Sequence, residues 1–517
     1  MTDEPSPQTK LSPAAIGELV DKLIPASELK PSSIDDVVRL PAFASKLQEC
    51  ERCWGASFGE IAHAVQDAVV LRRLQQMTYT AMLNPLWREL LVSAGLRDGL
   101  PSFEAWQQIP LADKNTQREL FMGSRPGLVV PLSRGGFEIV ASGGTSSGLP
   151  VETVYSLREL QDTYKVAGSF MGNYQLNNYL TGSDPKWVFT TLADYQMWSS
   201  GTMVGGVLQH IPGINYVGAG PVVEAVFQHM FSYKGPKALM GISAGIAILS
   251  ELGAGMNQEA RESFRVALYG SGVLSQRKRA ELVALYPNLA ILSYFAATQA
   301  ETIGLQLAPH SSWLAAVPGL HLIEIVDSKG RWVADGEEGE LVVTRLHAHE
   351  APLLRLKLGD RMIRRPRTDG VLKTQQFEFA GRSGDVLHLN DTQYSAPRAF
   401  AALCAELKTA SAFDLAVVAH EVQFVNYREA RLLVLIASVD DVSGLGYRMS
   451  CCLGADGLRR VFVNALVHSL SLFNQGEATP ASIDKIGYRF ELRLVHRVSG
   501  EIHRTAVGKV PLLRDVF

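Results

Sequence analysis

The feature that most constrains this chain is a run of glycine and hydroxyl residues, Ala141-Ser142-Gly143-Gly144-Thr145-Ser146-Ser147-Gly148-Leu149-Pro150. An apolar run at 137–140 precedes it, and branched and aromatic residues follow at 151–155, so the pattern predicts a strand, a flexible loop and a second strand. Glycines allow backbone N–H groups to approach phosphate oxygens closely, and hydroxyls add donors for phosphate or ligands for a magnesium ion. The run therefore indicates nucleotide binding, although a plain turn between strands has the same composition. It is not a Walker A loop, because no Gly-Lys-Ser/Thr ends it and no helix begins directly behind it.

The composition is that of an ordinary globular protein, since 47% of the 517 residues are hydrophobic and 20% are charged. This length accommodates one large domain and a smaller one. A net charge of −3 gives no reason to expect nucleic acid or an anionic membrane surface as a partner. Residues 1–10 lack the apolar core of a secretory signal, and no later apolar run is long enough to cross a bilayer, so we expect a cytoplasmic protein.

The cysteines give no sign of a disulfide framework, because a chain of this length has only five. Cys50 and Cys53 form one C-x-x-C motif, but no second Cys or His pair follows at zinc-finger spacing. We therefore expect two reduced thiols at this motif rather than a metal site.

Helix signals dominate the first part of the chain. Ser12-Pro13 is a capping hydroxyl followed by proline at the first helical position, and apolar residues recur at helical spacing from Ile16 to Ile24. The same spacing recurs from Ile61 to Val69, in a helical stretch that continues toward Leu96. We expect residues 1–104 to form a mainly helical lead-in to a large domain.

Strand and helix patterns alternate after the glycine-rich run. Ser156-Leu157-Arg158-Glu159 is a capping box, which places the start of a helix at about Leu157. Strand patterns then follow at 186–191, 214–217, 238–242 and 266–270, with helix patterns between them. This alternation favours a largely parallel sheet covered by helices, and such sheets bind ligands at the carboxyl ends of their strands.

The glycine-rich run resembles the phosphate-binding signature of the adenylate-forming (ANL) superfamily, which includes acyl-CoA ligases, luciferases and peptide-synthetase adenylation domains. Further segments resemble superfamily motifs in the same order, namely Val266 to Gly272, Ile291 to Gly304, Pro352 to Asp360, Phe379 to Asp385 and Arg504 to Val510. The resemblance covers residues 105–517, and the ordered set is a stronger signal than any one motif. The phenylacetate-CoA ligase-like branch, including the phenazine-pathway adenylating proteins, looks nearest.

The resemblance implies an α/β fold, with a large ANL-type N-terminal domain of helix-covered β-sheets and a small α+β C-terminal lid domain. We place the adenylate-forming core at residues 105–380 and the lid at 381–517, with a hinge in Gly381-Arg382-Ser383-Gly384-Asp385. Within the lid, the residue patterns predict strands at 415–418, 431–436 and 488–495 and an amphipathic helix at 458–473.

The same resemblance implies roles for individual residues. Glu301 would hold magnesium together with Thr145, Asp360 would accept hydrogen bonds from both ribose hydroxyls, and Lys509 would reach the α-phosphate. Arg382 would donate to ribose or phosphate, and with Glu301 and Lys509 it completes the implied catalytic set. The other implied nucleotide contacts are Ser142, Gly143, Gly144, Ser146, Ser147, Gly148, Gly270, Ser271, Gly272 and Thr298.

Alternatives remain for the arginine-rich segment around Asp360. An isolated Gly-Asp is usually an exposed turn, here with Arg361 as its ion-pair partner, but the order of the motifs favours the ribose contact. The cluster of arginines fits a solvated hairpin better than a binding patch. Its members are Arg361, Arg364, Arg365 and Arg367.

The chain departs from the superfamily pattern at three places. Ala297 stands where the superfamily has an adenine-stacking tyrosine, Gly384 replaces the first aspartate of the hinge pair, and no lysine lies beside Pro150. Tyr294 and Phe295 are nearby candidates for stacking on adenine, although aromatic residues at a strand end are more often core.

The pocket for the acid is expected among Tyr195, Trp198, His210 and the turn from Gly270 to Gly272. These residues suggest an aromatic or apolar acid, and each of them also fits plain packing. For His210 we favour a hydrogen-bonded core position over a catalytic base.

The implied function is ATP-dependent activation of a carboxylic acid as an acyl-adenylate, with release of pyrophosphate and then thioester formation with coenzyme A. The expected cofactors are ATP, Mg²⁺ and coenzyme A, and the expected partner is a small-molecule carboxylic acid. Transfer to an amine, a carrier protein or a partner enzyme of secondary metabolism stays open, as does a homodimer. A second class of function is a non-catalytic protein that binds a nucleotide or an acyl-adenylate, against which the retained set of Glu301, Asp360, Arg382 and Lys509 argues.

Overall fold

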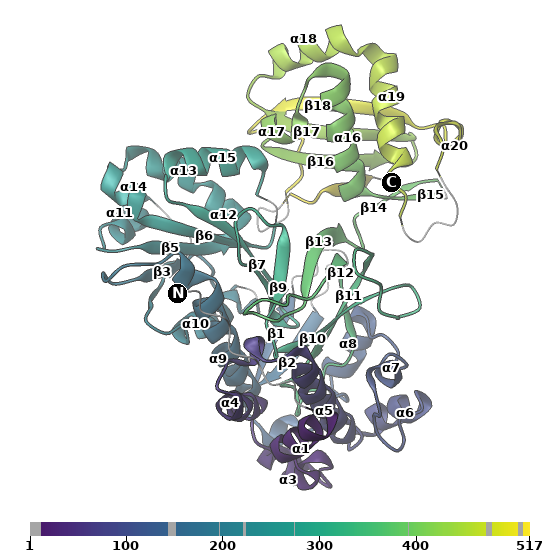
Figure 1. Ribbon diagram of the computed structural model, residues 1–517. Coiled ribbons are helices and arrows are strands. Elements are labelled where there is room, and N and C mark those ends of the chain that lie inside the picture. Colours follow the sequence, from purple (N-terminus) through teal and green to yellow (C-terminus); the bar gives the residue numbers. More distant parts are fainter. Residues whose placement is uncertain are drawn as a thin grey trace.

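The computed structural model describes residues 12–142, 151–195, 197–220, 224–272, 274–390, 392–471, 478–504 and 510–516. They form a large body and a smaller C-terminal unit, which lies at the top of Figure 1. Across these described ranges, every helix is too short or too polar to cross a lipid bilayer.

The helices begin where the capping residues predict. The Ser12 side chain accepts a hydrogen bond from the Ala15 N–H (3.2 Å), and Ser156 and Glu159 form the expected capping box at the start of α9. The helical stretch expected to continue toward Leu96 is divided into α5 and α6, because Asn84 caps the second helix and proline occupies its first turn. The α-helices are α1 (Pro13–Leu23), α2 (Ala26–Leu29), α3 (Ile34–Arg39), α4 (Phe43–Trp54), α5 (His63–Ala81), α6 (Pro85–Ser93), α7 (Phe103–Trp106), α8 (Lys114–Phe121), α9 (Leu157–Tyr174), α10 (Ser200–Gln209), α11 (Glu224–Phe231), α12 (Ser243–Ala247), α13 (Leu249–Leu252), α14 (Gln258–Ser263), α15 (Gln276–Leu285), α16 (Ala396–Ser411), α17 (Leu415–Val418), α18 (Val442–Cys452), α19 (Gly454–Val467) and α20 (Pro480–Lys485).

The main sheet has 11 strands within the described ranges, in the order β10-β11-β12-β13-β9-β8-β7-β6-β5-β3-β4. The neighbours from β4 to β7 pair in parallel, which confirms the parallel sheet expected from the alternating patterns. From β7 to β10 the pairs are antiparallel, so β7 lies where the two halves meet. The strands of this sheet are β3 (Trp187–Thr190), β4 (Asn215–Gly218), β5 (Lys237–Ile242), β6 (Phe264–Gly270), β7 (Ala290–Ala297), β8 (Glu301–Gln306), β9 (Trp313–Ala316), β10 (His321–Val326), β11 (Glu338–Arg345), β12 (Leu356–Arg365) and β13 (Gln376–Arg382).

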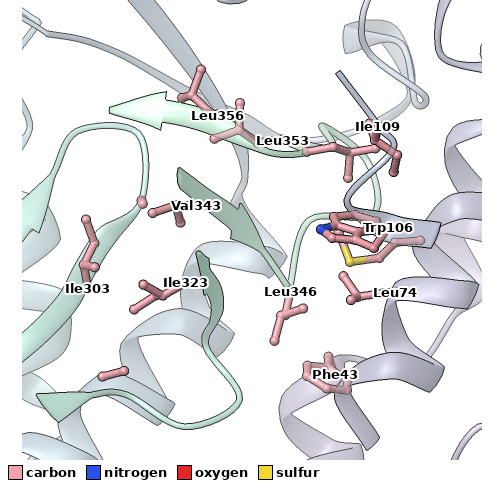
Figure 2. Packing of buried hydrophobic residues seen from close by; sticks show 14 of the residues in the cluster. Phe43, Leu74, Trp106, Ile109, Ile303, Ile323, Val343, Leu346, Leu353 and Leu356 are labelled. Carbon is pink, nitrogen blue, oxygen red and sulfur yellow. The ribbon is translucent and has the colours of Figure 1, made fainter. Parts of the chain in front are cut away.

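The largest hydrophobic cluster joins the N-terminal helices to the antiparallel half of the sheet (Figure 2). Phe43 from α4, Leu74 from α5 and Trp106 from α7 supply the helical side of this cluster. Ile303 from β8 and Val343 from β11 belong to its sheet side, and all five side chains are almost completely buried. Because burial of such side chains is the main stabilising term, the helical segment anchors the strands that carry the candidate site.

The C-terminal unit has its own sheet, in the order β18-β17-β16-β19, and its own hydrophobic cluster. Helices α16 and α19 belong to this unit and pack against each other (Figure 1). The expected combination of a large α/β part and a small α+β C-terminal part is therefore confirmed. The four strands of the C-terminal sheet are β16 (Glu421–Tyr427), β17 (Leu432–Val439), β18 (Arg489–His496) and β19 (Leu513–Val516). The strands β14 (Val386–Leu389) and β15 (Thr392–Ser395) pair separately as a hairpin.

One strand expected in this unit is wrong, because residues 415–418 form the helical turn α17. The N–H groups of Val417 and Val418 donate to the carbonyl of Asp414, so the backbone pairs locally. Leu415 is fully buried while Val417 is 48% exposed, so only part of this short apolar run faces the core. A run of four apolar residues fits a helical turn and a strand equally well, and periodicity cannot separate them.

Candidate active site

The glycine-rich run lies between β1 (Phe137–Ser142) and β2 (Val151–Ser156), which pair as an antiparallel hairpin. The last described pair before the run is Ser142 opposite Val151, so the predicted arrangement of strand, loop and strand is confirmed for the two strands. The expectations for Gly143, Gly144, Thr145, Ser146, Ser147 and Gly148 lie outside the described residues, as does the expectation for Lys509.

Glu301 is the first residue of β8, in the tight turn that joins β7 to β8 at the junction of the sheet. It was expected in a loop, and its φ of +50° is a left-handed conformation that a residue with a side chain seldom adopts. The residue is 4% exposed, and its Oε2 atom has no hydrogen-bond partner among the described residues. Its Oε1 atom accepts a long hydrogen bond from the Thr163 hydroxyl (3.5 Å).

The carboxyl group of Glu301 titrates abnormally. Burial raises its pKa to about 8, although the nearby positive charge of Arg345 opposes this rise. A buried carboxylate with one unsatisfied oxygen is costly unless a cation or a donor meets it. Mg²⁺ is usually held by one or two carboxylates together with waters and substrate phosphates, so this oxygen fits a magnesium ion.

Several residues that the sequence did not single out surround Glu301. Burial is the main reason why the pKa values of Glu301 and of Tyr164 in α9 are raised. The nearby charge of Glu138 in β1 adds to the rise for Glu301, and the charge of Glu301 adds to the rise for Tyr164. The Tyr164 hydroxyl is buried and has no hydrogen-bond partner among the described residues. The tyrosine that ends β2, Tyr155, donates its hydroxyl hydrogen to the carbonyl of Thr298 (2.7 Å). A tyrosine next to a capping serine has no distinctive spacing, so the sequence offered no signal for these contacts.

The turn at residues 270–272 follows the carboxyl end of β6, next to β7. A β-carbon on Gly270 would stand 2.9 Å from the carbonyl oxygen of Tyr294, and one on Gly272 would stand 2.3 Å from the Ser243 hydroxyl. Gly272 also has a φ of +125°, and Ser271 between them is exposed with a φ of +55°. The turn therefore requires glycine at both ends, which its tight packing alone explains.

Asp360 and Arg382 lie opposite each other on β12 and β13, and Arg382 Nε is 3.4 Å from Asp360 Oδ1. Asp360 is 8% exposed, whereas the Arg382 side chain is 60% exposed. Burial raises the pKa of Asp360 to about 6, and the charge of Arg382 opposes that rise. The alternative of an exposed turn is wrong, since Asp360 lies within β12 and is buried, and Arg361 pairs with Glu338 (2.5 Å).

The arginine cluster after Asp360 is engaged in ion pairs along β12 and the segment after it. Arg364 pairs with Asp335 (2.9 Å), and Arg367 pairs with Asp67 of α5 (2.8 Å). Arg365 pairs with Glu378 on the neighbouring strand β13. These side chains are partly exposed and neutralised, so the structure offers no basic patch in this segment for an anion.

Aromatic residues near Ala297 divide into core and surface. Tyr294 is buried, and its hydroxyl is hydrogen-bonded to the Thr302 hydroxyl (2.7 Å), as expected for a core residue. Phe295 is half-buried and contacts Phe379 of β13 at 6.1 Å between ring centroids. Phe379 is 43% exposed and precedes Arg382 by three residues. The contact brings the end of β7 close to the strand that carries Arg382.

The residues expected to line an acid pocket lie around α10. Tyr195 is 61% exposed and forms a tight bridge with Trp198, just before the helix. The N–H of Ala141 in β1 donates to the carbonyl of Met197 (3.0 Å), so this bridge is attached to the strand before the glycine-rich run. His210 follows α10, and its Nδ1 lies 2.8 Å from the carbonyl oxygen of Gly206. The ring is thus hydrogen-bonded by the backbone, as expected, but it is half-buried and does not lie in the core.

No group of three potential metal-ligating side chains occurs among the residues that the structure describes. Cys50 and Cys53 are both free, and burial raises the pKa of the Cys50 thiol to about 12. A thiol protonated at neutral pH is a poor metal ligand. Neither thiol takes part in a disulfide bond.

The described residues share their fold with solved structures of an acyl-CoA ligase. The chain is similar to the crystal structure of 2-hydroxyisobutyryl-CoA ligase in the postadenylation state in complex with 2-HIB-AMP, with a TM-score of 0.66, 16% sequence identity, and coverage of 88% of this chain and 91% of that chain. The TM-score is 0.59 for an open conformation of the same enzyme, at 16% identity and coverage of 88% and 93%. It is 0.53 for the thioesterification state in complex with 2-HIB-AMP and CoA, at 16% identity and coverage of 88% and 91%.

At 16% identity this structural similarity shows a shared fold alone, and that fold is the one expected from the sequence. The closer placement in the phenylacetate-CoA ligase-like branch stays a prediction. No protein-family model and no curated protein sequence matches the chain.

Proposed function

We propose that this protein uses ATP to activate a carboxylic acid as an acyl-adenylate, with release of pyrophosphate. The observation that carries the proposal is the buried carboxylate of Glu301, which has one oxygen without a partner and lies in a strained turn at the sheet junction. Strained residues with unsatisfied buried polar groups persist where function requires them. The ANL fold and the pair of Asp360 and Arg382 support the same conclusion.

The proposed chemistry follows from charge. A carboxylate that attacks the α-phosphate of ATP is an anion approaching an anion, so the site must neutralise the developing negative charge. Glu301, with Thr145, would hold Mg²⁺, whose chemistry is to withdraw charge from phosphate oxygens. The run from Ser142 to Gly148 would bind the phosphates and Lys509 would bind the α-phosphate. Asp360 would accept hydrogen bonds from the ribose, while Arg382 would donate to ribose or phosphate.

The acceptor in this proposal is coenzyme A. The TM-score against 2-hydroxyisobutyryl-CoA ligase is 0.66 for its postadenylation state and 0.53 for its thioesterification state. This difference supports an orientation of the C-terminal unit like that of the postadenylation state. We place the boundary between the core and this lid at residues 380–381. The lid would then rotate about the hinge from Gly381 to Asp385 to admit the thiol. The acid is proposed to be aromatic or apolar, with its pocket beside α10.

The first test is acid-dependent ATP–pyrophosphate exchange across aromatic, aliphatic and polyketide-type acids. Asp360→Ala and Lys509→Ala are expected to lower exchange by about tenfold or more, because each removes a charged contact made to the nucleotide. Exchange with some acid would establish the activation step and identify the substrate class. Absence of exchange with every acid, together with measurable ATP binding, would contradict the proposal and favour a nucleotide-binding protein.

A second test concerns the lid. Arg398 in the first turn of α16 forms an ion pair with Glu338 of β11, which belongs to the large domain. The Glu338 side chain is only 4% exposed and also pairs with Arg361. Arg398→Ala is expected to lower exchange up to about fivefold, since loss of a partly exposed ion pair is worth up to about 1 kcal/mol and here destabilises the adenylation orientation. Lys408→Ala is the control, because Lys408 pairs with Asp414 inside the C-terminal unit (2.7 Å). Equal effects of the two substitutions would contradict a role for Arg398 in lid orientation.

A further inference from the structure

The side chain of Tyr155 connects the strand after the glycine-rich run to the turn that carries Glu301. Tyr155 lies in β2, which begins at Val151, directly after that run. Its hydroxyl donates to the carbonyl of Thr298 (2.7 Å), and Thr298 lies in the turn three residues before Glu301. One hydrogen bond therefore ties two segments that are more than a hundred residues apart in sequence.

The Tyr155 ring is held rigidly by a second residue. The guanidinium carbon of Arg345 lies 4.2 Å from the ring centroid, in cation–π geometry. Arg345 Nη2 donates to the carbonyl of Val154 in β2 (3.0 Å) and to that of Ala351 (2.7 Å). Tyr155 is 2% exposed and Arg345 is 3% exposed, so both are shielded from water.

The turn that Tyr155 contacts needs such a support. Glu301 has a left-handed φ of +50°, and the pairing of β7 with β8 shifts register between Phe295 and Ala296. A strained residue in a short turn relaxes unless neighbouring contacts hold it. The Thr298 carbonyl is a point at which a side chain from outside the hairpin of β7 and β8 reaches this turn.

We infer that Tyr155 is a positioning residue, whose hydrogen bond to the Thr298 carbonyl sets the place of the Glu301 carboxylate relative to β2. This inference rests on the proposed function, in which Glu301 holds the magnesium ion beside the nucleotide. A displacement of about 1 Å between groups that act on one substrate is enough to reduce turnover strongly.

Tyr155→Phe tests the inference, and the chain offers a matched control. Tyr286, which caps the C-terminus of α15, is 0% exposed and donates its hydroxyl hydrogen to the Leu249 carbonyl at the same distance of 2.7 Å, but it belongs to a different core cluster. Tyr155→Phe and Tyr286→Phe remove equivalent buried hydrogen bonds and should lower the melting temperature by similar amounts.

The readouts separate positioning from stability. For Tyr155→Phe we expect the Mg²⁺ concentration that gives half-maximal pyrophosphate exchange to rise by about tenfold, with an unchanged KM for the acid. Binding of Mn²⁺ in the presence of a non-hydrolysable ATP analogue, measured by electron paramagnetic resonance, should weaken by a similar factor. Tyr286→Phe should leave both quantities at the parent values.

Equal metal dependence in the parent, Tyr155→Phe and Tyr286→Phe would overturn the inference and make the bond merely structural. If Tyr155→Phe does not fold, Arg345→Lys keeps the charge but changes the group that stacks on the ring, and a raised metal requirement is expected there as well. An unaltered requirement in folded Arg345→Lys would equally count against the inference. If the parent gives no exchange with any acid, the proposed function fails, while the Mn²⁺ measurement still decides whether Tyr155 positions Glu301.

Discussion

Replacing Glu301 with glutamine is expected to lower acid-dependent ATP–pyrophosphate exchange by about a hundredfold or more. The amide keeps the size of the side chain but loses the negative charge that would hold magnesium beside the phosphates, a contribution of several kcal/mol to the transition state. The folded protein should not suffer, because a buried carboxylate oxygen without a partner disfavours folding. Exchange kinetics and the melting temperature, both measured as a function of Mg²⁺, check these expectations.

Glu138→Gln is the matched control for Glu301→Gln. Glu138 is a half-buried carboxyl group in β1, and it lies close enough to Glu301 to influence its pKa. If charge near the site were all that mattered, both substitutions would reduce exchange alike. We expect Glu138→Gln to stay within a few-fold of the parent and to retain stabilisation by Mg²⁺ with ATP, which Glu301→Gln should lose.

Replacing His347 with glutamine is expected to make the protein more resistant to acid. His347 is 3% exposed, its ring packs edge-on against Phe43 at 5.5 Å, and burial lowers its pKa to about 3, with Arg73 adding to the effect. The pKa of an unfolded histidine is about 6.5, so below that pH the unfolded chain binds a proton that the folded chain does not. Stability is therefore full above pH 6.5 and falls as the pH drops toward 3.

The pH dependence of the unfolding free energy should differ between His347→Gln and the parent by a measurable amount. One proton contributes about 1.4 kcal/mol per pH unit, and the unfolded histidine is half-protonated at pH 6.5 and almost fully protonated at pH 4.5. The difference in unfolding free energy between His347→Gln and the parent should therefore shift by about 2 kcal/mol between these pH values. Denaturant titrations at several pH values measure the shift. His310→Gln, at an exposed position, should show no such shift. A parallel pH dependence of His347→Gln and the parent would contradict the assignment of a neutral buried ring.

The helix starts were predictable because their signals are local. Ser12 and the pair of Ser156 and Glu159 satisfy the first free N–H groups of their own helices, and no distant residue is needed for that. The segment at 415–418 was mispredicted for the opposite reason. Four apolar residues do not determine a helical or an extended backbone, and packing against the C-terminal core decides between them.

The candidate site was predictable only in part. The positions of Glu301 and Asp360 followed from short motifs in a fixed order, and both are buried carboxyl groups in the structure. Their electrostatic environment did not follow, because burial and the charges of Arg345 and Arg382 act through space. The hydrogen bond between Tyr155 and Thr298 could not be predicted from the sequence either, since it joins residues 143 positions apart.

The sequence by itself determined the class of fold, the helix caps, the two strands around the glycine-rich run and the order of the site motifs. These features depend on side-chain periodicity and on contacts within a few residues, which the chain carries wherever it folds. Only the tertiary structure decided that Asp360 is buried beside Arg382, and that Glu301 is a buried residue with a left-handed backbone, in a turn that accepts a hydrogen bond from Tyr155. Burial and long-range pairing arise when distant segments pack together, and no local pattern encodes which groups then lose their water.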